Sequence, residues 1–278
     1  MQECLGNLFI YNGTLTDTSH FDVSFLDHPY YIYEVFRVID KTALFLEDHL
    51  QRLQETCELS KHCQKFSSQE IKRYVYEVID ANQLYEGNMK IVLYYKQDTG
   101  PQFLVYISKH EYPTPEQFKT GVPVSLFKGM RINPNAKVMD VELRKATNKM
   151  KEERDVYETL FVDEEGCITE GSRSNVFFIR MGKIITPPLQ DVLPGITRKH
   201  IMEICRELSL DVIEEKVPAR SVVIMEAVFI SGTSRKVLPV NQVNDLEFDP
   251  YHPITGKIQS GFNKRVTDYI SHHKQKMV

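Results

Sequence analysis

Three groups that could act together chemically follow one another between residues 131 and 198. Lys137 comes first and a carboxylate, Glu170, comes second. The third is the segment 193–198, Leu-Pro-Gly-Ile-Thr-Arg, which stands ahead of an apolar helical pattern. Gly195 lets the backbone turn closely, so that the next amides point outward at a helix N-terminus, where an anion is stabilised.

An amine, a carboxylate and an anion site are together what a pyridoxal-phosphate enzyme needs. The amine forms a Schiff base with the cofactor, and the carboxylate keeps the ring nitrogen protonated, because a nearby anion favours the charged form. The helix N-terminus takes the phosphate. Each group also has an ordinary explanation by itself: a surface lysine, an exposed glutamate in a turn, and a threonine N-cap.

The composition is that of a globular protein with one large domain or two modest ones: 278 residues, 42% hydrophobic and 26% charged. A net charge of -4 gives no electrostatic reason to expect nucleic acid or an anionic membrane as a partner. Five scattered cysteines without a CxxC pair fit reduced thiols better than disulfides or a metal site. The chain shows no signal-peptide layout and no apolar run of membrane length, so we expect a cytoplasmic protein.

The first part of the chain mixes strand and helix patterns. Asn12-Gly13 predicts a hairpin turn, and Ser67 with Glu70 predicts a capping box at the start of a helix. The expected elements are strands at 30–38, 43–46, 89–95 and 102–108, and helices from Glu47 and over 69–82. The segment 110–121 holds two prolines and mostly polar residues, so we expect a domain linker there.

The second part alternates strands with helices. Met139, Leu143, Ala146 and Met150 fall at helical spacing, which predicts a helix after Lys137. The other expected elements are strands at 158–162, 175–180, 183–186, 211–217 and 227–231, and helices over 198–208 and 257–272. We therefore expect an α+β protein with a small α/β domain over 1–115 and a larger domain over 122–278 that carries Lys137.

The motifs LEDHLQRL, EGSRSN, LPGITR and SGTS, in this order with Lys137 among them, resemble the fold-type IV pyridoxal-phosphate enzymes. That family includes branched-chain and D-amino-acid aminotransferases and aminodeoxychorismate lyase. The resemblance covers nearly the whole chain and is therefore more specific than any single motif. It implies two domains, the larger with a mixed, β-barrel-like core and flanking helices, and it implies pyridoxal 5'-phosphate and a homodimer.

The resemblance raises the question of which lysine carries the cofactor. Lys145-Ala-Thr-Asn148 copies the family's K-x-x-N signature, but Glu170 lies only 25 residues after Lys145 and 33 after Lys137. The spacing from Lys137 is the one that resembles the family, and Lys145 would require the loss of about two helical turns. We therefore select Lys137, which leaves Asp140 where the family has asparagine.

The other cofactor residues are carried over from the family's motifs. Glu170 is the residue that contacts the pyridine nitrogen, and Arg52 is the phosphate arginine, whose guanidinium can pair with two phosphate oxygens. Thr233, in the SGTS turn, bonds the phosphate, and the neighbouring amides face the substrate carboxylate. The full set implied is Arg52, Lys137, Glu170, Gly195, Ile196, Thr197, Thr233 and Ser234.

The resemblance is weaker on the substrate side. Tyr33 falls where the family places an active-site tyrosine, and Tyr31 could add to that wall or be plain core. The R-x-H pair of the D-amino-acid enzymes is missing, although Lys96 could replace it. Arg131, six residues before Lys137, could approach the cofactor's ring hydroxyl.

The leading functional hypothesis is an aminotransferase that moves an amino group between two small molecules, an amino acid (branched-chain or similar) and a 2-oxo acid. The second is a lyase of the aminodeoxychorismate type, which would use the same lysine, glutamate and phosphate site to eliminate pyruvate. The third is an inactive cofactor-binding homologue, which Asp140 and the missing glycine-rich loop near Tyr33 would favour. The sequence separates the first two poorly, because both reactions need the same lysine, glutamate and phosphate site. The Tyr33-Glu34 strand and the SGTS turn favour the aminotransferase.

Overall fold

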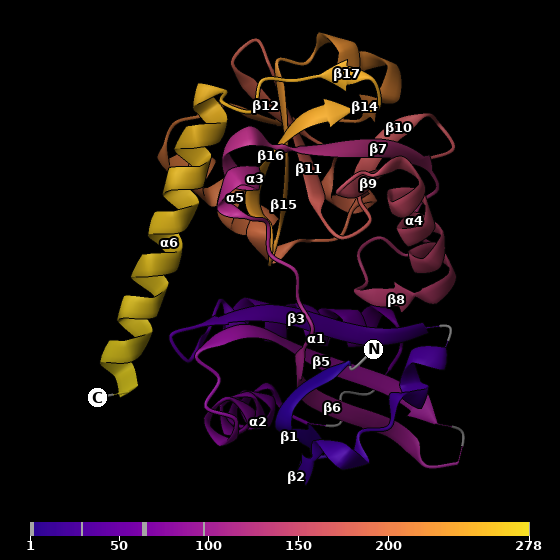
Figure 1. Cartoon of the computed structure of the whole chain (residues 1–278), viewed down its shortest axis with the longest axis vertical. Helices are drawn as coiled ribbons and strands as arrows, with labels where there is room; N and C mark the ends of the chain where they lie inside the picture. The colour runs from indigo at the N-terminus through magenta and orange to yellow at the C-terminus, as the bar shows by residue number, and fades with distance from the viewer. Residues whose placement is uncertain (1–2, 29, 63–65, 97, 278) are drawn as a thin grey trace. The chain divides into compact units, whose positions relative to one another are not determined.

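The computed structural model describes residues 3–28, 30–62, 66–96 and 98–277 (Figure 1). The chain divides into two compact units. Unit 1 consists of Met1–Glu111, Ala136–Glu142 and Val266–Val278, and unit 2 of Tyr112–Asn135 and Leu143–Arg265. Residues 136–142 and 266–278, which we expected in the second domain, thus cluster with unit 1.

Unit 1 is built on one sheet with the strand order β2-β1-β6-β5-β3-β4, and β8 also pairs with β3. Its strands are β1 (Cys4–Tyr11), β2 (Thr14–Asp17), β3 (Tyr30–Ile39), β4 (Thr42–Ala43), β5 (Glu86–Lys96), β6 (Gly100–Ser108) and β8 (Val138–Asp140). Its helices are α1 (Leu46–Leu59) and α2 (Ser68–Ala81), with short 3₁₀ turns at η1 (Thr18–His20) and η2 (Val23–Asp27).

The local signals of the first half are confirmed by the backbone. Asn12 and Gly13 have φ of 50° and 90°, as a tight hairpin turn requires. The Ser67 hydroxyl accepts from the Glu70 amide, and the Glu70 carboxylate accepts from the Ser67 amide, which completes the capping box of α2. The strand expected over 43–46 is only Thr42–Ala43, because α1 begins already at Leu46.

Strand β3 separates two apolar layers of unit 1, since alternate side chains of a strand point to opposite faces. Ile32, Phe36 and Val38 pack in one core cluster with residues of α1 and α2. Tyr31 and Tyr33 pack on the other face in a second, aromatic cluster. This strand therefore presents tyrosines on one face and Glu34 on the face of α1.

The segment after Lys137 differs from the expected helix. Val138–Asp140 forms β8, which pairs antiparallel with β3, and α4 begins only at Val141 and ends at Arg154. The helical spacing describes the residues from Val141 onward, but the edge of β3 offers backbone partners to Val138–Asp140. The strand pairing places the backbone next to Lys137 alongside Tyr33.

Unit 2 contains a second sheet with the order β13-β12-β11-β15-β16-β7-β9-β10-β14, and β17 pairs with β16. Its strands are β7 (Val122–Lys128), β9 (Glu158–Val162), β10 (Cys167–Gly171), β11 (Asn175–Arg180), β12 (Lys183–Thr186), β13 (Val212–Glu214), β14 (Val217–Pro218), β15 (Ala227–Gly232), β16 (Lys236–Val243) and β17 (Leu246–Glu247). Its helices are α3 (Pro115–Thr120), most of α4, α5 (Ile196–Glu207) and the first half of α6 (Pro253–Met277), with 3₁₀ turns η3 (Leu189–Asp191) and η4 (Ala219–Ile224).

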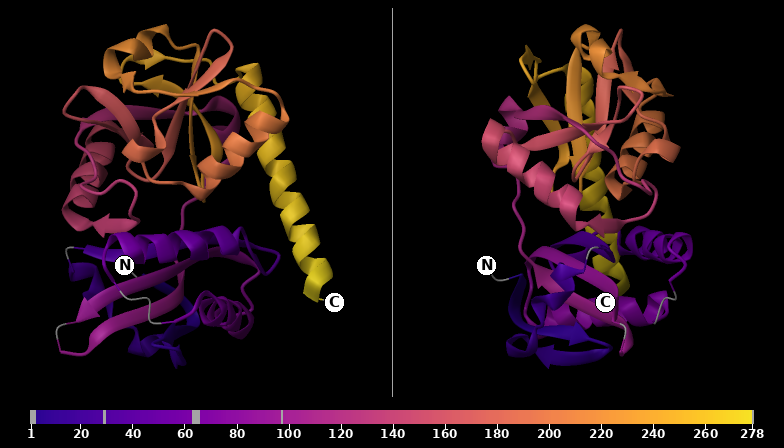
Figure 2. Two further views of the ribbon diagram at one scale, coloured as in Figure 1. Left: turned by 180° about the vertical axis from the view of Figure 1, so that it is seen from behind. Right: turned by 90° about the vertical axis from the view of Figure 1, so that its right-hand side faces the viewer.

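Three features of unit 2 differ from the sequence-based expectation. The segment expected to be a linker contains α3, where Thr114 and Gln117 form a capping box and Pro115 opens the helix. Strands β7 and β16, which pair in parallel, had not been predicted. Helix α6 runs without a break from Pro253 to Met277, longer than the expected 257–272 (Figure 2).

The described cysteines, Cys4, Cys57, Cys167 and Cys205, are all free and buried, and Cys63 lies outside the described residues. None of the helices in the described part of the chain is long and apolar enough to cross a membrane.

Candidate active site

Lys137 and Tyr33 are brought together in unit 1 by the pairing of β8 with β3. The Tyr33 amide donates to the Lys137 carbonyl oxygen at 3.2 Å, and the Lys137 amide donates to the Thr56 hydroxyl at 3.2 Å. The Lys137 Nζ atom lies 4.6 Å from the centroid of the Tyr33 ring. A cation at this distance from a ring face is attracted to it. The chosen lysine therefore lies half-buried against the tyrosine predicted to face the substrate.

The alternative lysine is in a different environment. Lys145 is an exposed residue of α4, in the part of that helix that belongs to unit 2. Asp140, which takes the place of the family's asparagine, lies in β8 opposite Tyr30 of β3.

A buried ion-paired cluster lies on the opposite face of β3. The Glu34 carboxylate accepts from Arg52 Nε at 2.8 Å and from Arg52 Nη2 at 2.7 Å, and its Oε2 lies 2.7 Å from His49 Nδ1. His49 and Arg52 are one helical turn apart on α1, so their side chains share a face. All three are almost completely buried.

Opposing effects act on the protonation of this cluster. Burial alone raises the pKa of Glu34, but the charge and hydrogen bonds of Arg52, with the hydrogen bond of His49, lower it to about 2. Burial lowers the pKa of His49 against the effect of Glu34, and the charges of Arg52 and Lys137 lower it further. His49 had not been singled out from the sequence, although its His-x-x-Arg spacing before Arg52, on a helix that faces a strand glutamate, was an available signal.

An aromatic wall surrounds a second lysine of unit 1. Tyr31 packs edge-on to Tyr33 with ring centroids 6.0 Å apart. Lys90 Nζ lies 5.4 Å from the Tyr31 ring and 5.9 Å from the Tyr33 ring, and it pairs with Glu3 at 2.8 Å. Sequence reasoning missed Lys90, although a lysine inside an apolar strand is unusual.

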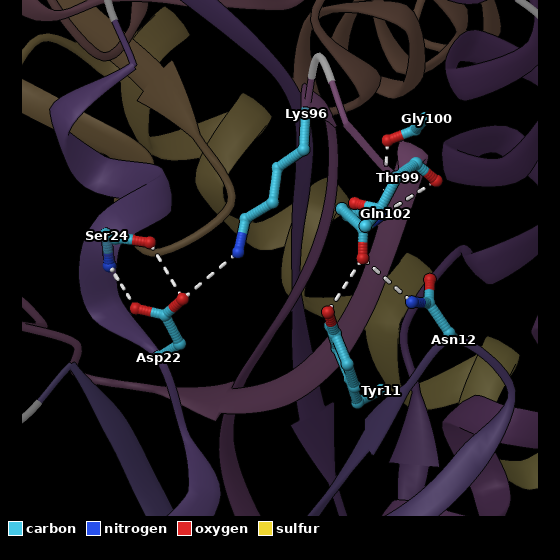
Figure 3. A network of polar contacts seen from close by, with 8 residues as sticks. All are labelled: Tyr11, Asn12, Asp22, Ser24, Lys96, Thr99, Gly100 and Gln102. Atoms are coloured by element: carbon cyan, nitrogen blue, oxygen red, sulfur yellow. Dashed lines mark hydrogen bonds and ion pairs between the residues drawn. The ribbon is translucent and has the colours of Figure 1, made fainter.

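Lys96, proposed from the sequence as a substrate residue, lies further along β5. Val92 is the residue of β5 opposite Tyr33, and four strand residues span about 13 Å. The Lys96 ammonium pairs with Asp22 at 3.2 Å, near the Gln102 side chain that joins Tyr11 and Asn12 (Figure 3). The structure thus gives Lys96 a carboxylate partner and does not group it with Lys137.

In unit 2, Glu170 is buried at the end of β10 rather than exposed in a turn. Arg131 Nε lies 3.0 Å from its Oε1, and the Leu193 amide donates to its Oε2 at 3.2 Å. The carboxylate is therefore held between a cation and the segment that precedes α5. Arg131, which we expected near a ring hydroxyl, is a partner of Glu170.

The predicted anion turn is the N-terminus of α5, which begins at Ile196 with Gly195 as its N-cap. Because this N-cap residue is a glycine, it has no side chain with which to accept from the first amides of the helix. A Cβ built on Gly195 would lie 2.0 Å from the Asn175 side-chain oxygen. Only glycine fits here, because the Asn175 amide also donates to the Leu193 carbonyl at 2.9 Å.

The SGTS turn adjoins the same region of unit 2. Ser231, at the end of β15, pairs in register with Asn175, at the start of β11. Thr233 and Ser234 follow in the turn between β15 and β16 and are half-buried. Strand pairing and Asn175 therefore link three predicted elements of unit 2: the Glu170 segment, the start of α5 and the SGTS turn.

Each unit assembles its own set of the predicted residues. In unit 1, the Lys137 amine, which can act as a nucleophile or a base, lies against the Tyr33 ring on one face of β3. The buried Glu34, His49 and Arg52 cluster lies on the other face. In unit 2, a buried carboxylate neighbours a helix N-terminus whose N-cap is a glycine, and a second turn. These are groups that can hold a phosphate, fix a heterocycle by its protonated nitrogen and move a proton.

Comparisons with known proteins agree with this reading. Residues 31–243 match the family described as amino-transferase class IV. The chain is 26% identical to D-alanine aminotransferase of Bacillus licheniformis over 250 residues, which cover 84% of this chain and 88% of that protein.

The fold is that of solved aminotransferases. The crystal structure of the branched-chain aminotransferase from Thermoproteus uzoniensis with norvaline superposes with a TM-score of 0.86 at 21% identity, covering 95% of this chain and 96% of that one. A putative 4-amino-4-deoxychorismate lyase from Legionella pneumophila has a TM-score of 0.77 at 21% identity, covering 84% and 90%. With its α+β architecture and a family match over most of its length, this chain belongs to the class IV aminotransferases, a family of enzymes.

Proposed function

We propose that this protein is a pyridoxal-phosphate-dependent aminotransferase that moves an amino group between an amino acid, branched-chain or similar, and a 2-oxo acid. The observation that supports it most is Lys137, half-buried with its ammonium 4.6 Å from the Tyr33 ring. A lysine in such a place is shielded from water on one side and differs from the exposed Lys145.

The residues of unit 2 fit the phosphate and the ring of this cofactor. The N-cap residue of α5, Gly195, has no side chain that could cap the helix, and the absence of a Cβ there keeps the backbone close to Asn175. Glu170 is buried as a carboxylate beside Arg131. When bound, pyridoxal 5'-phosphate supplies an electron sink for the charge that develops at the substrate α-carbon.

Each residue has a defined role in this proposal. The amides of Ile196 and Thr197, with Thr233 and Ser234, hold the phosphate. Arg52 is assigned to the phosphate by its motif, and its guanidinium holds Glu34. Glu170 accepts a hydrogen bond from the protonated ring nitrogen, and its charge keeps that proton in place.

Lys137 is the group that would move the proton. Its amine would hold the cofactor and, when free, would take the proton from the substrate α-carbon. The Tyr33 ring keeps the amine in position, and Tyr31 extends the same wall. Lys96 and Arg131 remain candidates for contacts with the substrate.

The protein is also proposed to act as a homodimer in the cytoplasm, with residues 1–115 and 122–278 as functional domains. Relatives whose names specify branched-chain and D-alanine aminotransferases support the amino-acid class. The R-x-H pair that the resemblance associates with D-amino acids is missing, which favours the branched-chain type.

The test is the visible absorbance of the purified holoenzyme while single amino acids are added. We expect a yellow protein whose absorbance bleaches with at least one amino acid and returns with a 2-oxo acid. The amino acid that bleaches it identifies the donor.

A lyase is the second candidate, supported by the likeness in fold to a putative 4-amino-4-deoxychorismate lyase. If no amino acid bleaches the absorbance and pyruvate is released from aminodeoxychorismate, the lyase replaces the aminotransferase. If the protein binds the cofactor but does neither, both enzymatic proposals are wrong.

A further inference from the structure

Unit 2 contains a buried carboxylate that the proposed reaction does not use. Glu158, at the start of β9, is fully buried. It accepts hydrogen bonds from the Ser172 hydroxyl at 2.6 Å, the Ser174 hydroxyl at 3.2 Å and the Thr159 amide at 3.0 Å. Its Oε2 also pairs with Arg235 Nη2 at 3.1 Å. Burial raises the pKa of Glu158, but the charges of Arg235 and Lys151 and the hydrogen bonds of Ser172 and Thr159 lower it below its usual value.

Arg235 is held in place by more than this ion pair. Its Nη1 donates to the Arg173 carbonyl oxygen at 3.3 Å, and its guanidinium carbon lies 5.3 Å from the centroid of the Tyr157 ring. The side chain is only 11% exposed. Its Nε is buried and has no hydrogen-bond partner among the described residues. A buried donor without an acceptor is costly and calls for an explanation.

Two further cations, Lys151 and Arg173, lie in the region of the Glu158–Arg235 pair. Lys151 Nζ lies 6.0 Å from the centroid of the same Tyr157 ring that Arg235 faces. Arg173, whose carbonyl holds Arg235, extends its own guanidinium to the Asn148 side-chain oxygen at 2.9 Å and is exposed. We call Lys151, Arg173 and Arg235 the cationic cluster.

The balance of charge in this cluster is positive. Burial lowers the pKa of Lys151, Glu158 raises it, and the charges of Arg173, Arg235 and Arg144 lower it. One carboxylate therefore favours the charged form of Lys151, and three guanidinium groups disfavour it. Like charges held close together near the protein surface repel one another, and a bound anion would reduce this repulsion.

The cationic cluster borders two segments of the proposed active site. Arg173 lies between Glu170 and Asn175, and Arg235 directly follows Thr233 and Ser234. The two segments touch: a Cβ built on Gly232 would lie 3.3 Å from the Arg173 carbonyl oxygen and 4.0 Å from Arg235 Cδ. An anion bound by the cluster would thus lie next to the turn whose amides we assign to the substrate carboxylate.

We propose that Lys151, Arg173 and Arg235 form a second anion-binding site, separate from the phosphate-binding N-terminus of α5, that takes a carboxylate or phosphate group. Guanidinium groups suit these oxyanions because their paired N–H donors match two oxygens. Two sources carry this chemistry: an acidic group at the far end of the substrate, or a free anion such as inorganic phosphate. The first source depends on the proposed aminotransferase activity, and the second does not.

The first experiment measures the thermal unfolding midpoint of the cofactor-loaded protein as inorganic phosphate is added at constant ionic strength. A ligand that binds the native state raises the midpoint. The variants are Arg173→Gln and Lys151→Gln, which leave the Glu158–Arg235 pair intact. Lys149→Gln is the matched control, since Lys149 is a highly exposed lysine of the same helix.

The proposed anion site leads to two predictions for these variants. Without phosphate, Arg173→Gln and Lys151→Gln should unfold at a higher midpoint than wild type, because each removes repulsion. With phosphate, their midpoints should rise much less than those of wild type and Lys149→Gln. If both variants unfold earlier than wild type and respond to phosphate as wild type does, the cations are structural and the proposal is wrong.

The second experiment identifies the source of the anion. Glutamate and glutamine have nearly the same shape and differ in the charge of the distal group. If the cluster binds that group, Arg173→Gln should raise KM for glutamate about tenfold, or about 1.4 kcal/mol, and leave KM for glutamine unchanged. Unchanged KM values together with a lost phosphate response would assign the site to a free anion. Absence of any turnover would refute the aminotransferase, while the unfolding measurement would still decide on the anion site.

Discussion

The Lys137 ammonium lies 4.6 Å from the centroid of the Tyr33 ring, while the Tyr33 amide donates to the Lys137 carbonyl oxygen at 3.2 Å. Two contacts of different kinds thus join the same two residues. The backbone contact fixes their separation, and the ring face stabilises the charged amine.

Replacement of Tyr33 tests whether the ring or the hydroxyl matters. Tyr33→Leu removes the ring and should lower kcat/KM about tenfold, since a contact of about 0.5–2 kcal/mol is lost. Tyr33→Phe keeps the ring and should stay within about threefold of wild type. Steady-state kinetics with the best amino acid measures both. Equal losses in the two variants would assign the effect to the hydroxyl.

The choice between the two lysines is tested by covalent trapping. After borohydride reduction, mass spectrometry should find the cofactor attached to residue 137 in wild type and in Lys145→Ala. Lys137→Ala should bind the cofactor without a reducible bond and lose several orders of magnitude in kcat, because the amine that moves the proton is gone. Trapping that persists in Lys137→Ala and disappears in Lys145→Ala would contradict the assignment.

Glu34 should make stability depend on acid pH. Its pKa in the folded protein is about 2, below the ordinary 4.5, so its stabilising contribution is complete above 4.5 and is lost as the pH falls towards 2. The contribution is on the order of 3 kcal/mol, measured as the free energy of unfolding in urea between these pH values.

Glu34→Gln should remove this part of the pH dependence. At neutral pH it should destabilise the protein by about 3–5 kcal/mol, because Arg52 would be left as a buried, uncompensated charge. Glu58→Gln, at an exposed position of the same helix, serves as the control and should change stability little. If Glu34→Gln loses as much stability in acid as the wild type does, groups other than Glu34 cause the pH dependence.

Gly195→Ala should weaken cofactor binding through a steric effect. The backbone of Gly195, with φ of -65°, suits any residue, but the new Cβ would lie 2.0 Å from the Asn175 oxygen. We expect a loss of at least about tenfold in cofactor affinity and about 1–3 kcal/mol in stability. Gly256→Ala is the control, since no atom lies within 4 Å of a Cβ there. Equal affinities in the two variants would contradict the proposed role of the turn.

The sequence by itself determined those features that depend on neighbouring residues. The Asn12-Gly13 turn, the Ser67–Glu70 capping box and the helix expected from Glu47 require only local backbone preferences and periodicity, and each was predicted. The order of the motifs was sufficient for the family, which the match over residues 31–243 confirms. The selection of Lys137 over Lys145 stays a prediction until the trapping experiment is done.

Tertiary structure decided which side chains share an environment. β8 forms because β3 offers an open edge, which no periodicity within 138–140 reveals. Arg131 pairs with Glu170, and Glu34 with His49 and Arg52, because strands and helices far apart in the sequence bury them together. The same holds for Arg235, in the turn between β15 and β16, whose partner Glu158 lies at the start of β9. Burial removes water from these charges, and only then does the identity of the partner determine their chemistry.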